Sequence, residues 1–458
     1  MSKIPGFLIA APKSNSGKTL ITCALLKALK KRGKSVTAFK CGPDFIDPMF
    51  HRRVMGVPSK NLDTFFTESE VTRALFAEGA SLGEITVGEG VMGLFDGMGG
   101  SEERGSSYDL ARTLGMSIVL IIDAKGLSRS ILPIVRGFLD YDTENLIKGI
   151  ILNRVGESQF KLLKELVESE LKISVFGYFP ETKAFEIKSR HLGLITPGEV
   201  TDFNELTEKG SAVAEECIDI SALEKLETKT DYSEAGLLEG LLKDYYSEEF
   251  KGVKVGVAMD DAFCFYYEDN LELIKKMGAE ILPFSPIKDT TLPENVDALI
   301  FPGGYPELFA FELSTNTALM QDIQIKIANG IPVIAECGGY MYLTESIEEK
   351  SGNIYPMTDI IETKTRYEGR SSRFGYITVR ENVEGTFLGG DEIRGHEFHY
   401  FNSEDNGDDC LAVKPVGNKK WLCVHADKTK WLGYPHLYYY SCPAYAYNFL
   451  KAAKKYHG

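Results

Sequence analysis

Short apolar runs of strand length alternate with amphipathic stretches along most of this 458-residue chain, in two successive series. The first series has its runs at 6–12, 35–40, 85–90, 117–124, 147–155 and 173–180, and the second at 253–259, 279–284, 296–304 and 331–339. Strands that alternate with helices predict a parallel, doubly wound sheet, because parallel neighbours need a crossover connection. We therefore expect an α/β fold in each series.

Between the two series lies a polar stretch, residues 221–250, that contains no apolar run of strand length. We interpret it as a helical or extended linker that joins a first domain at 1–220 to a second domain at 251–458. The chain length supports this division, because roughly 150 residues per domain predicts two to three domains. Each half is also long enough to bury a core of its own.

The composition excludes several classes of protein. A formal net charge of −15 argues against a nucleic-acid-binding protein, which normally carries a basic surface. The eight cysteines are scattered and form no CxxC pair, so neither a zinc site nor a disulfide framework is suggested. The opening residues MSKIPGFLIA do not fit a signal peptide, and no run of about 18 apolar residues could cross a membrane. We expect a cytoplasmic enzyme that binds neither nucleic acid nor membrane.

The stretch APKSNSGKT, residues 11–19, follows the first apolar run and ends like a phosphate-binding loop. Pro12 stands where the pattern G-x-x-x-x-G-K-[ST] has glycine, so this position cannot donate an N–H group. The N–H groups from Lys13 through Ser16 can still cradle anionic oxygens. A GKT that occurs by chance is the alternative, but the strand, loop and helix signals here all agree with the motif.

The end of this loop predicts how a nucleotide triphosphate would be held. Gly17 lets the backbone approach the phosphates, Lys18 would reach the β- and γ-phosphates, and the Thr19 hydroxyl would hold Mg²⁺. Lys13 lies five residues before Lys18, which resembles the extra lysine of deviant phosphate-loop ATPases. ATP and Mg²⁺ are therefore the expected cofactors.

Four acidic residues follow predicted strands, where open α/β sheets bind their ligands. Asp44 and Asp47 belong to KCGPDFIDP, and Glu89 and Asp96 belong to GEGVMGLFDG. A triphosphate site needs one or two acids to hold Mg²⁺, so the others could position an acceptor group. The alternative for each aspartate is that it only caps a turn. For Asp47, which precedes Pro48, turn chemistry favours a capping role and a functional role equally.

In the second series, IPVIAECGGYMYLTESI predicts a buried strand, a sharp turn with Cys337, and a helix. A thiol at such a turn is exposed at the top of the sheet, and we expect the helix amino terminus to lower its pKa. Backbone N–H groups of Gly338 and of Gly303 or Gly304 could stabilise an oxyanion. The alternative is a small buried hydrophobic residue. The histidines that could serve as the base are His396, His399 and His436.

A series of motifs resembles the cobyrinic acid a,c-diamide synthase family over nearly the whole chain. These motifs are FKCGPDFIDPMFHR, NLDTFF, EGVMGLFDG, DLARTLG, ILNRVG, RHLGL, AFCFYYEDNLELI, FPGGYPE, AECGGYMYL and GHEFHY. The resemblance implies an ATP-binding domain similar to dethiobiotin synthetase, joined to a class I-type glutamine amidotransferase domain. It also implies amidation of the a and c acetate side chains of cobyrinate in cobalamin synthesis, with L-glutamine, ATP and Mg²⁺. A homodimer is compatible with this resemblance.

The resemblance also implies roles for the second domain. Cys337 corresponds to the glutaminase nucleophile and His436 to its base. Gly304 and Gly338 would form the oxyanion hole. Class I glutaminases usually carry glutamate two residues after that histidine, whereas this chain has Tyr438, as relatives with cobyrinate-type substrates do. What orients the His436 ring is therefore open.

For the first domain, the resemblance assigns Lys18 and Thr19 to the phosphate loop and Asp44 and Glu89 to the metal. Asp47 and Asp96 correspond to acids near the phosphorylated carboxylate, and Asn153 to a contact of the adenine ring. Three further residues fall in family motifs without a role that follows from their chemistry: Arg190, His191 and Tyr266. Arginines that could pair with substrate carboxylates are Arg52, Arg53, Arg366, Arg370 and Arg373, each with a solvated side chain as the alternative.

Together these assignments predict that ATP converts a substrate carboxylate into an acyl phosphate, which ammonia released at Cys337 then captures. Other readings remain open. The same chemistry could act on another tetrapyrrole such as nickel-sirohydrochlorin, while the related cobyric acid synthase is usually longer and reads differently around CGPDFIDP. A deviant phosphate-loop ATPase that acts as a switch would leave Cys337 and His436 without a role, and a non-enzymatic corrinoid carrier would not need the loop.

Overall fold

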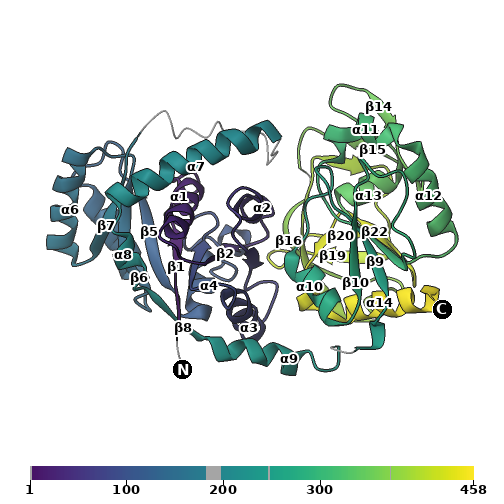
Figure 1. Ribbon diagram of the computed structural model, residues 1–458, viewed down its shortest axis with the longest axis horizontal. Coiled ribbons are helices and arrows are strands. Elements are labelled where there is room, and N and C mark those ends of the chain that lie inside the picture. Colours follow the sequence, from purple (N-terminus) through teal and green to yellow (C-terminus); the bar gives the residue numbers. More distant parts are fainter. Residues whose placement is uncertain (1–2, 182–196, 246–247, 372, 458) are drawn as a thin grey trace. The chain divides into compact units, whose positions relative to one another are not determined.

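A computed structural model describes residues 3–181, 197–245, 248–371 and 373–457 of the chain. The chain forms two compact units, Met1–Leu241 and Leu242–Gly458. Each unit is built around a sheet with parallel strands and flanking helices (Figure 1). The predicted two-domain α/β fold is confirmed.

Within the described residues, the sheet of the first unit has eight strands in the order β3-β2-β4-β1-β5-β6-β7, and β8 pairs with β1. The strands are β1 Lys3–Ala10, β2 Val36–Cys41, β3 Ser59–Leu62, β4 Ile85–Glu89, β5 Ser117–Asp123, β6 Ile147–Asn153, β7 Ser174–Phe179 and β8 Glu227–Asp231. All neighbours are parallel except β8, which runs antiparallel to β1. The carboxyl ends of β1, β2 and β4 therefore meet at one edge, where the phosphate loop and the acidic motifs begin.

The helices of the first unit are α1 Lys18–Lys31, α2 Ile46–Arg53, α3 Ser69–Ala80, α4 Ser107–Leu114, α5 Ile131–Tyr141, α6 Glu157–Leu171, α7 Pro197–Cys217, α8 Ile220–Leu223 and α9 Leu237–Leu241, with short 3-10 turns η1 Met98–Gly100 and η3 Tyr232–Gly236. Helix α1 buries Ile21, Leu25 and Leu29 completely, as its helical spacing predicts. Burial of each such side chain contributes roughly 1.5–3 kcal/mol. Helix α7 lies beside α1 (Figure 1). Glu208 of α7 forms ion pairs with Lys27 and Lys31 of α1.

Of the segment 221–250, expected to be a linker, residues 221–241 belong to the first unit and contribute structure to it. Its strand β8 pairs with Lys3 and Pro5 of β1, before the part of β1 that pairs with β4 and β5. Beyond β8, Glu234 of η3 forms an ion pair with Arg73 of α3 at 2.7 Å. Backbone pairing needs no apolar run, so the polar sequence ETKTD gave no strand signal.

The second unit has a six-stranded sheet in the order β10-β9-β11-β12-β22-β21, in the part of the chain that the structure describes. Its strands are β9 Lys254–Ala258, β10 Glu280–Phe284, β11 Ala298–Phe301, β12 Val333–Glu336, β21 His425–Ala426 and β22 Lys430–Gly433. The helices and 3-10 turns are η4 Glu248–Phe250, α10 Glu268–Lys276, η5 Pro306–Phe309, α11 Ala310–Thr315, α12 Thr317–Ala328, α13 Gly338–Leu343, η6 Tyr439–Ser441 and α14 Pro443–His457. All pairs in this sheet are parallel except β21 with β22.

Two smaller sheets complete the second unit, in the orders β14-β13-β15-β18 and β20-β19-β16-β17-β23. Their strands are β13 Thr344–Glu348, β14 Ile354–Pro356, β15 Ile361–Tyr367, β16 Phe374–Glu381, β17 Glu392–Phe398, β18 Phe401–Ser403, β19 Cys410–Val413, β20 Lys420–Cys423 and β23 His436–Leu437. The pairing of β17 with β23 places His396 opposite His436. Two histidine motifs that lie 40 positions apart in the sequence therefore become neighbours.

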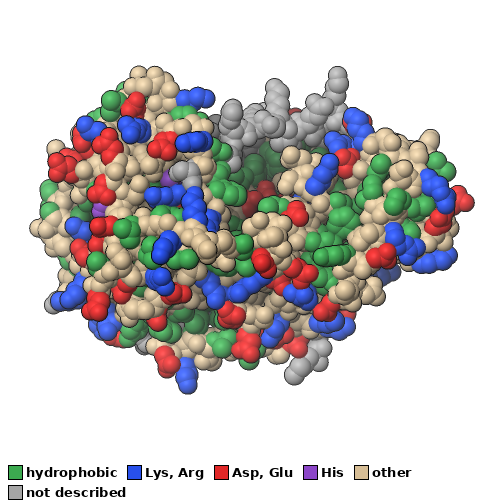
Figure 2. Space-filling view, turned by 180° about the vertical axis from the view of Figure 1, so that it is seen from behind, with side chains coloured by type: hydrophobic (Ala, Val, Ile, Leu, Met, Phe, Trp, Pro, Cys, Tyr) green, Lys and Arg blue, Asp and Glu red, His purple; other side chains and the backbone are tan. Residues whose placement is uncertain are grey.

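The surface agrees with the composition. Lysine and arginine side chains are interspersed with acidic ones over the face shown in Figure 2. A helix that is long and apolar enough to cross a bilayer does not occur among the described residues.

Candidate functional site

The phosphate-binding loop lies between β1 and α1, and a residue of a distant strand holds it. Asn15 and Gly17 adopt left-handed backbone conformations, with φ of 60° and 91°. Asn153, at the end of β6, donates from Nδ2 to the carbonyl oxygen of Ser16 at 2.8 Å. A Cβ atom at Gly17 would lie 2.4 Å from that same Nδ2, so the contact requires glycine. Asn153 therefore supports the phosphate-binding loop through its side-chain amide.

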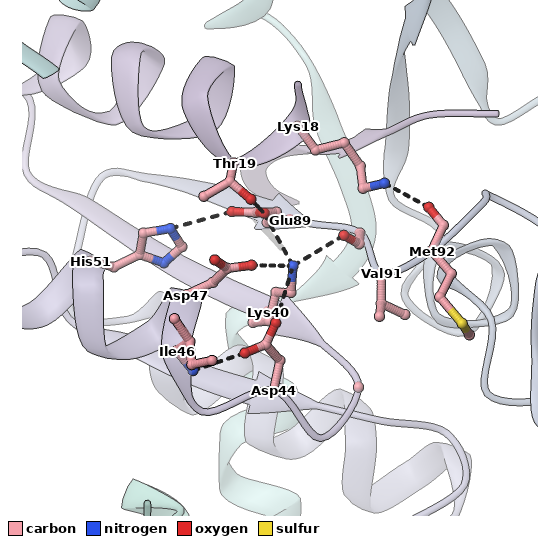
Figure 3. A network of polar contacts seen from close by, with 12 residues as sticks. Lys18, Thr19, Lys40, Asp44, Ile46, Asp47, His51, Glu89, Val91 and Met92 are labelled. Carbon is pink, nitrogen blue, oxygen red and sulfur yellow. Dashed lines mark hydrogen bonds and ion pairs between the residues drawn. The ribbon is translucent and has the colours of Figure 1, made fainter. Parts of the chain in front are cut away.

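The side chain of Lys18 lies across the loop. Its Nζ donates to the carbonyl oxygen of Met92 at 2.6 Å (Figure 3). It also donates to the carbonyl oxygen of Lys13 at 3.4 Å. Burial and the neighbouring Lys40 lower the pKa of Lys18 to about 8. The side chain of Lys13 is exposed, while its carbonyl also accepts the Ser16 hydroxyl at 2.9 Å. Both lysines therefore lie on the loop that the motif predicts.

Three of the four predicted acids gather around one lysine. The Nζ atom of Lys40 lies 2.5 Å from Asp47 Oδ2, 3.1 Å from Glu89 Oε1 and 3.8 Å from Asp44 Oδ2 (Figure 3). Thr19 joins this cluster, because its hydroxyl donates to Glu89 Oε1 at 2.7 Å. Sequence reasoning missed Lys40. The signal in the sequence was the position of Lys40 within the apolar run 35–40, which predicts a buried strand. The observed strand is Val36–Cys41, and all of its residues are buried.

The charges of this cluster depend on one another. Burial opposes the ammonium form of Lys40, but Asp47, Glu89 and Asp44 outweigh it and raise the pKa of Lys40. Burial and the adjacent Glu89 raise the pKa of Asp47. Burial also opposes ionisation of Glu89, yet Lys40 and His51 hold the pKa of Glu89 below its ordinary value. Glu89 therefore holds its negative charge more strongly than Asp47 does.

The donors of this cluster suit Mg²⁺, which prefers oxygen ligands and keeps several waters. Thr19 supplies a hydroxyl, and Asp44, Asp47 and Glu89 supply carboxylates. Asp47 and Glu89 are buried and Asp44 is half-buried, and the Lys40 ammonium supplies positive charge to all three.

Asp96 has a different environment from the other acids. Its side chain is exposed, and Oδ2 accepts the N–H of Gly93 at 2.9 Å, so it caps a turn. This turn lies against the phosphate loop, since Leu94 N donates to Ala11 O at 2.8 Å and a Cβ at Gly93 would lie 2.7 Å from Pro12 O. The structure thus brings the Asp96 turn to the loop but keeps the carboxylate engaged in the turn.

Cys337 occupies a sharp turn between β12 and α13. Its backbone has φ 48° and ψ −106°, a region that non-glycine residues rarely adopt. Gly338 follows, and a Cβ there would lie 2.9 Å from the backbone nitrogen of Gly304. The two glycines predicted for the oxyanion hole are therefore backbone neighbours beside Cys337.

The expected effect of the helix on the thiol is not observed. Burial raises the pKa of the Cys337 thiol well above its ordinary value, with smaller contributions from Glu307, Glu397 and Glu336. Helix α13 has only six residues, so its dipole is weak against the cost of burying a charge. The thiol therefore needs a base at the moment of attack.

His436 is buried in β23 beside this turn. Its Nδ1 lies 3.8 Å from Oε2 of Glu336, the residue before Cys337. The ring of His396 stacks on it at 4.9 Å between centroids and an interplanar angle of 13°. A Cβ at Gly303 would lie 2.3 Å from His436 Cε1, so the glycine loop touches the ring. Burial, with smaller contributions from His396 and His399, lowers the pKa of His436, which keeps the ring neutral and able to accept a proton.

The other two candidate histidines have partners elsewhere. Nδ1 of His396 lies 3.0 Å from the Tyr267 hydroxyl, and burial lowers the pKa of His396 to about 3. His399 Nε2 lies 2.8 Å from Glu397 Oε1, and the His399 ring stacks on Tyr434 at 3.9 Å. His396 therefore packs against His436, whereas His399 lies against the Glu397 carboxylate.

The remaining predicted residues are dispersed. Arg52 donates to the carbonyl oxygen of Ser59 at 2.9 Å. Arg366 pairs weakly with Glu404 at 3.9 Å, and Arg373 lies 3.5 Å from Glu397. Tyr266 is half-buried, whereas Arg53 and Arg370 are exposed. Arg190 and His191 lie outside the described residues.

Comparisons with known proteins agree with both halves of this geometry. Residues 7–195 match the CobQ/CobB/MinD/ParA nucleotide binding domain, and residues 254–440 match the CobB/CobQ-like glutamine amidotransferase domain. A cobyrinate a,c-diamide synthase of Caldanaerobacter subterraneus is 37% identical over 440 residues, which cover 95% of each chain. The chain belongs to the cobyrinate a,c-diamide synthase family.

Other members of the cobyrinate a,c-diamide synthase family align over similar lengths. The relative from Listeria innocua is 37% identical over 463 residues, 99% of this chain and 100% of its own length. The relative from Thermoplasma acidophilum is 39% identical over 402 residues, 87% of this chain and 88% of its own. The chain is accordingly a ligase with a nucleotide-binding domain and a glutamine amidotransferase domain, as its sequence predicts.

Proposed function

We propose that the protein amidates the a and c acetate carboxylates of cobyrinate, with ATP as the energy source and glutamine as the nitrogen donor. The observation that carries this proposal is the presence, in one chain, of a phosphate loop beside an acidic cluster and of Cys337 directly after Glu336, whose carboxylate lies 3.8 Å from His436 Nδ1. The names of relatives aligned over at least 94% of the chain support the choice of substrate. In this proposal residues 1–220 form the synthetase domain and residues 251–458 the glutaminase domain.

The first half of the reaction makes a substrate carboxylate reactive. A carboxylate is a poor acyl donor, because its leaving group would be oxide, whereas an acyl phosphate has a good leaving group. Thr19, Asp44 and Glu89 would hold Mg²⁺, which neutralises charge on the transferring phosphoryl group. Lys18 and Lys13 would contact the phosphate oxygens.

The other residues of the first unit would bind and orient the two substrates. Asn153, which already supports the loop, would lie near the adenine ring. Asp47 and Asp96 would face the acceptor carboxylate. For Asp47, the pairing with Lys40 at 2.5 Å offsets part of the negative charge that an anionic acceptor would otherwise meet there.

The second half releases ammonia from glutamine. His436 takes the proton of the Cys337 thiol as sulfur attacks the side-chain amide carbon, and the C–N bond then breaks as His436 returns the proton to the leaving nitrogen. The N–H groups of Gly304 and Gly338 would stabilise the oxyanion. Water then hydrolyses the thioester to glutamate. Ammonia attacks the acyl phosphate, and two rounds give two amides.

Mass spectrometry of the product tests this proposal. Purified protein is incubated with cobyrinate, ATP, Mg²⁺ and glutamine, and in parallel with nickel-sirohydrochlorin in place of cobyrinate. We expect two amide groups on cobyrinate, at positions a and c, with ADP formed in step. If only nickel-sirohydrochlorin is amidated, that tetrapyrrole is the substrate in place of cobyrinate. ATP consumption without amide formation on either compound would overturn the proposal.

A further inference from the structure

The acid that usually orients a class I glutaminase histidine is missing from its expected position. Two residues after His436 stands Tyr438, whose hydroxyl donates to Asp269 Oδ2 at 2.8 Å. Tyr438 is buried, and its partner Asp269 belongs to α10. The side chain at this position therefore engages another element of the fold, and a different residue must fix the imidazole.

Glu336 lies where such a residue is needed. It ends β12 directly before Cys337, and only 6% of its surface is exposed. Its Oε2 lies 3.8 Å from His436 Nδ1, and its Oε1 accepts the N–H of Leu437 at 3.3 Å. One carboxylate thus accepts a hydrogen bond from the backbone of Leu437 and lies beside the ring of His436.

The backbone of Glu336 is held by the centre of a sheet. Strand β12 lies between β11 and β22, and Glu336 is paired with Gly433 of β22. A carboxylate on such a strand has little freedom to move, which is what a group that positions another requires. The same strand end carries Cys337, so nucleophile and carboxylate share one rigid support.

We propose that Glu336 is the positioning residue of His436, and that it takes the place of the acid absent at Tyr438. The inference rests on the proposed glutaminase role of Cys337 and His436. Once the 3.8 Å separation closes to hydrogen-bond length, an ionised Glu336 would accept the Nδ1–H of the neutral ring, which would make Nε2 the nitrogen that takes the thiol proton. The carboxylate then stabilises the imidazolium that forms, and it holds no proton of its own in this step.

A second contact restrains the ring in the other direction. His396 stacks on one face of His436, and its own Nδ1 is fixed by the Tyr267 hydroxyl. Rotation of the His436 ring about its Cβ–Cγ bond would break this stack. Glu336 therefore acts on the ring edge while His396 acts on the ring face.

The electrostatics give this arrangement a pH dependence. Burial raises the pKa of Glu336 to about 8. The titratable groups that face it are His436 on β23, Cys337 at the start of α13, Tyr439 of η6 and Tyr445 of α14. A protonated Glu336 would donate to Nδ1 and leave the proton on Nε2, so the glutaminase should gain activity as pH rises toward 8 and above.

Kinetics of the full chain test the proposal. Glutamate release from glutamine is measured from pH 6 to pH 9 for the wild type, Glu336→Gln, Cys337→Ala and a control, Glu381→Gln. Glu381 is a suitable control because its Oε1 accepts from Thr386 in the same unit without contact to His436. We expect Glu336→Gln to lower kcat by roughly 100-fold, to change KM for glutamine little, and to lose the rise with pH. Ammonium-supported amidation should persist.

The outcomes separate this inference from the proposed function. Wild-type kcat and an unchanged pH profile in Glu336→Gln, with Cys337→Ala inactive, would overturn the role of Glu336 alone. Glutaminase activity in Cys337→Ala would overturn the proposed function as well. If Glu336→Gln does not fold, Glu336→Asp keeps a carboxylate at a longer distance, and we expect reduced kcat with the pH dependence retained. A wild-type kcat in Glu336→Asp would contradict the proposal.

Discussion

The Nζ atom of Lys40 lies 2.5 Å from Oδ2 of Asp47, and both side chains are buried, Lys40 near the end of β2 and Asp47 in the first turn of α2. Asp44 and Glu89 face the same ammonium. One lysine therefore offsets part of the negative charge of three carboxylates that the proposed function assigns to the metal and to the acceptor. We expect this ammonium to help keep the acidic site folded before nucleotide binds.

Replacement of Lys40 by methionine should destabilise the first unit. The change leaves three carboxylates without their buried counter-charge, and breaking a buried pair costs about 3–5 kcal/mol. Urea unfolding measures the loss, and added Mg²⁺ should recover part of it, because a bound cation stabilises the folded state. The control is Lys27→Met, which removes a more exposed ion pair to Glu208 and should cost less than about 1 kcal/mol. Equal effects of the two variants would contradict the account.

Replacement of Gly17 by alanine should weaken ATP binding. The new Cβ would lie 2.4 Å from Asn153 Nδ2, and φ of 91° disfavours any side chain. We expect at least a tenfold loss of affinity, about 1.4 kcal/mol, in calorimetry with a non-hydrolysable ATP analogue. Gly33→Ala is the matched control, since it shares a positive φ of 80° but has no atom within 4 Å of the new Cβ. It should bind ATP as the wild type does.

Replacement of Gly303 by alanine should impair the glutaminase alone. A Cβ there would lie 2.3 Å from His436 Cε1, so the ring must move away from its position beside Glu336. Glutamine-dependent amidation should fall by roughly 100-fold, as expected when a general base is misplaced. Amidation supported by ammonium should remain, and its loss would show that the substitution disturbs more than the ring.

Replacement of Glu336 by glutamine should stabilise the protein at high pH. The pKa of Glu336 is raised to about 8 in the folded chain, so between about pH 4.5 and pH 8 the folded state binds a proton that the unfolded state has lost. Wild-type stability therefore falls over this window, by up to roughly 1.4 kcal/mol per pH unit, whereas glutamine does not titrate. Thermal unfolding should show a gain in Tm for Glu336→Gln that is larger at pH 8 than at pH 5. A pH-independent difference would contradict the assignment.

Apolar runs predicted the central strands of both sheets, because buried parallel strands are nearly continuous in hydrophobic residues. Strands β3 and β8 were missed, since SKNL and ETKTD pair through their backbones and carry few apolar side chains. The two small sheets after Leu343, one mixed and one antiparallel, were missed for a related reason. Their strands depend on partners far away in the sequence, such as His396 opposite His436.

The candidate site shows the same division. The phosphate loop, the acids and Cys337 stand in local patterns that predict chemistry, and their roles stay predictions. Lys40 and Glu336 lie at strand ends, where a charged side chain normally points to solvent. Only the packing of neighbouring elements turns them into buried partners of Asp47 and His436.

The most direct test of the account follows an oxygen atom. Cobyrinate with heavy oxygen in its carboxylates is incubated with the protein, ATP, Mg²⁺ and glutamine, and the inorganic phosphate is examined by mass spectrometry. If the front unit activates the acid as an acyl phosphate, one labelled oxygen enters phosphate for each amide formed. Amide formation with unlabelled phosphate would contradict the central claim.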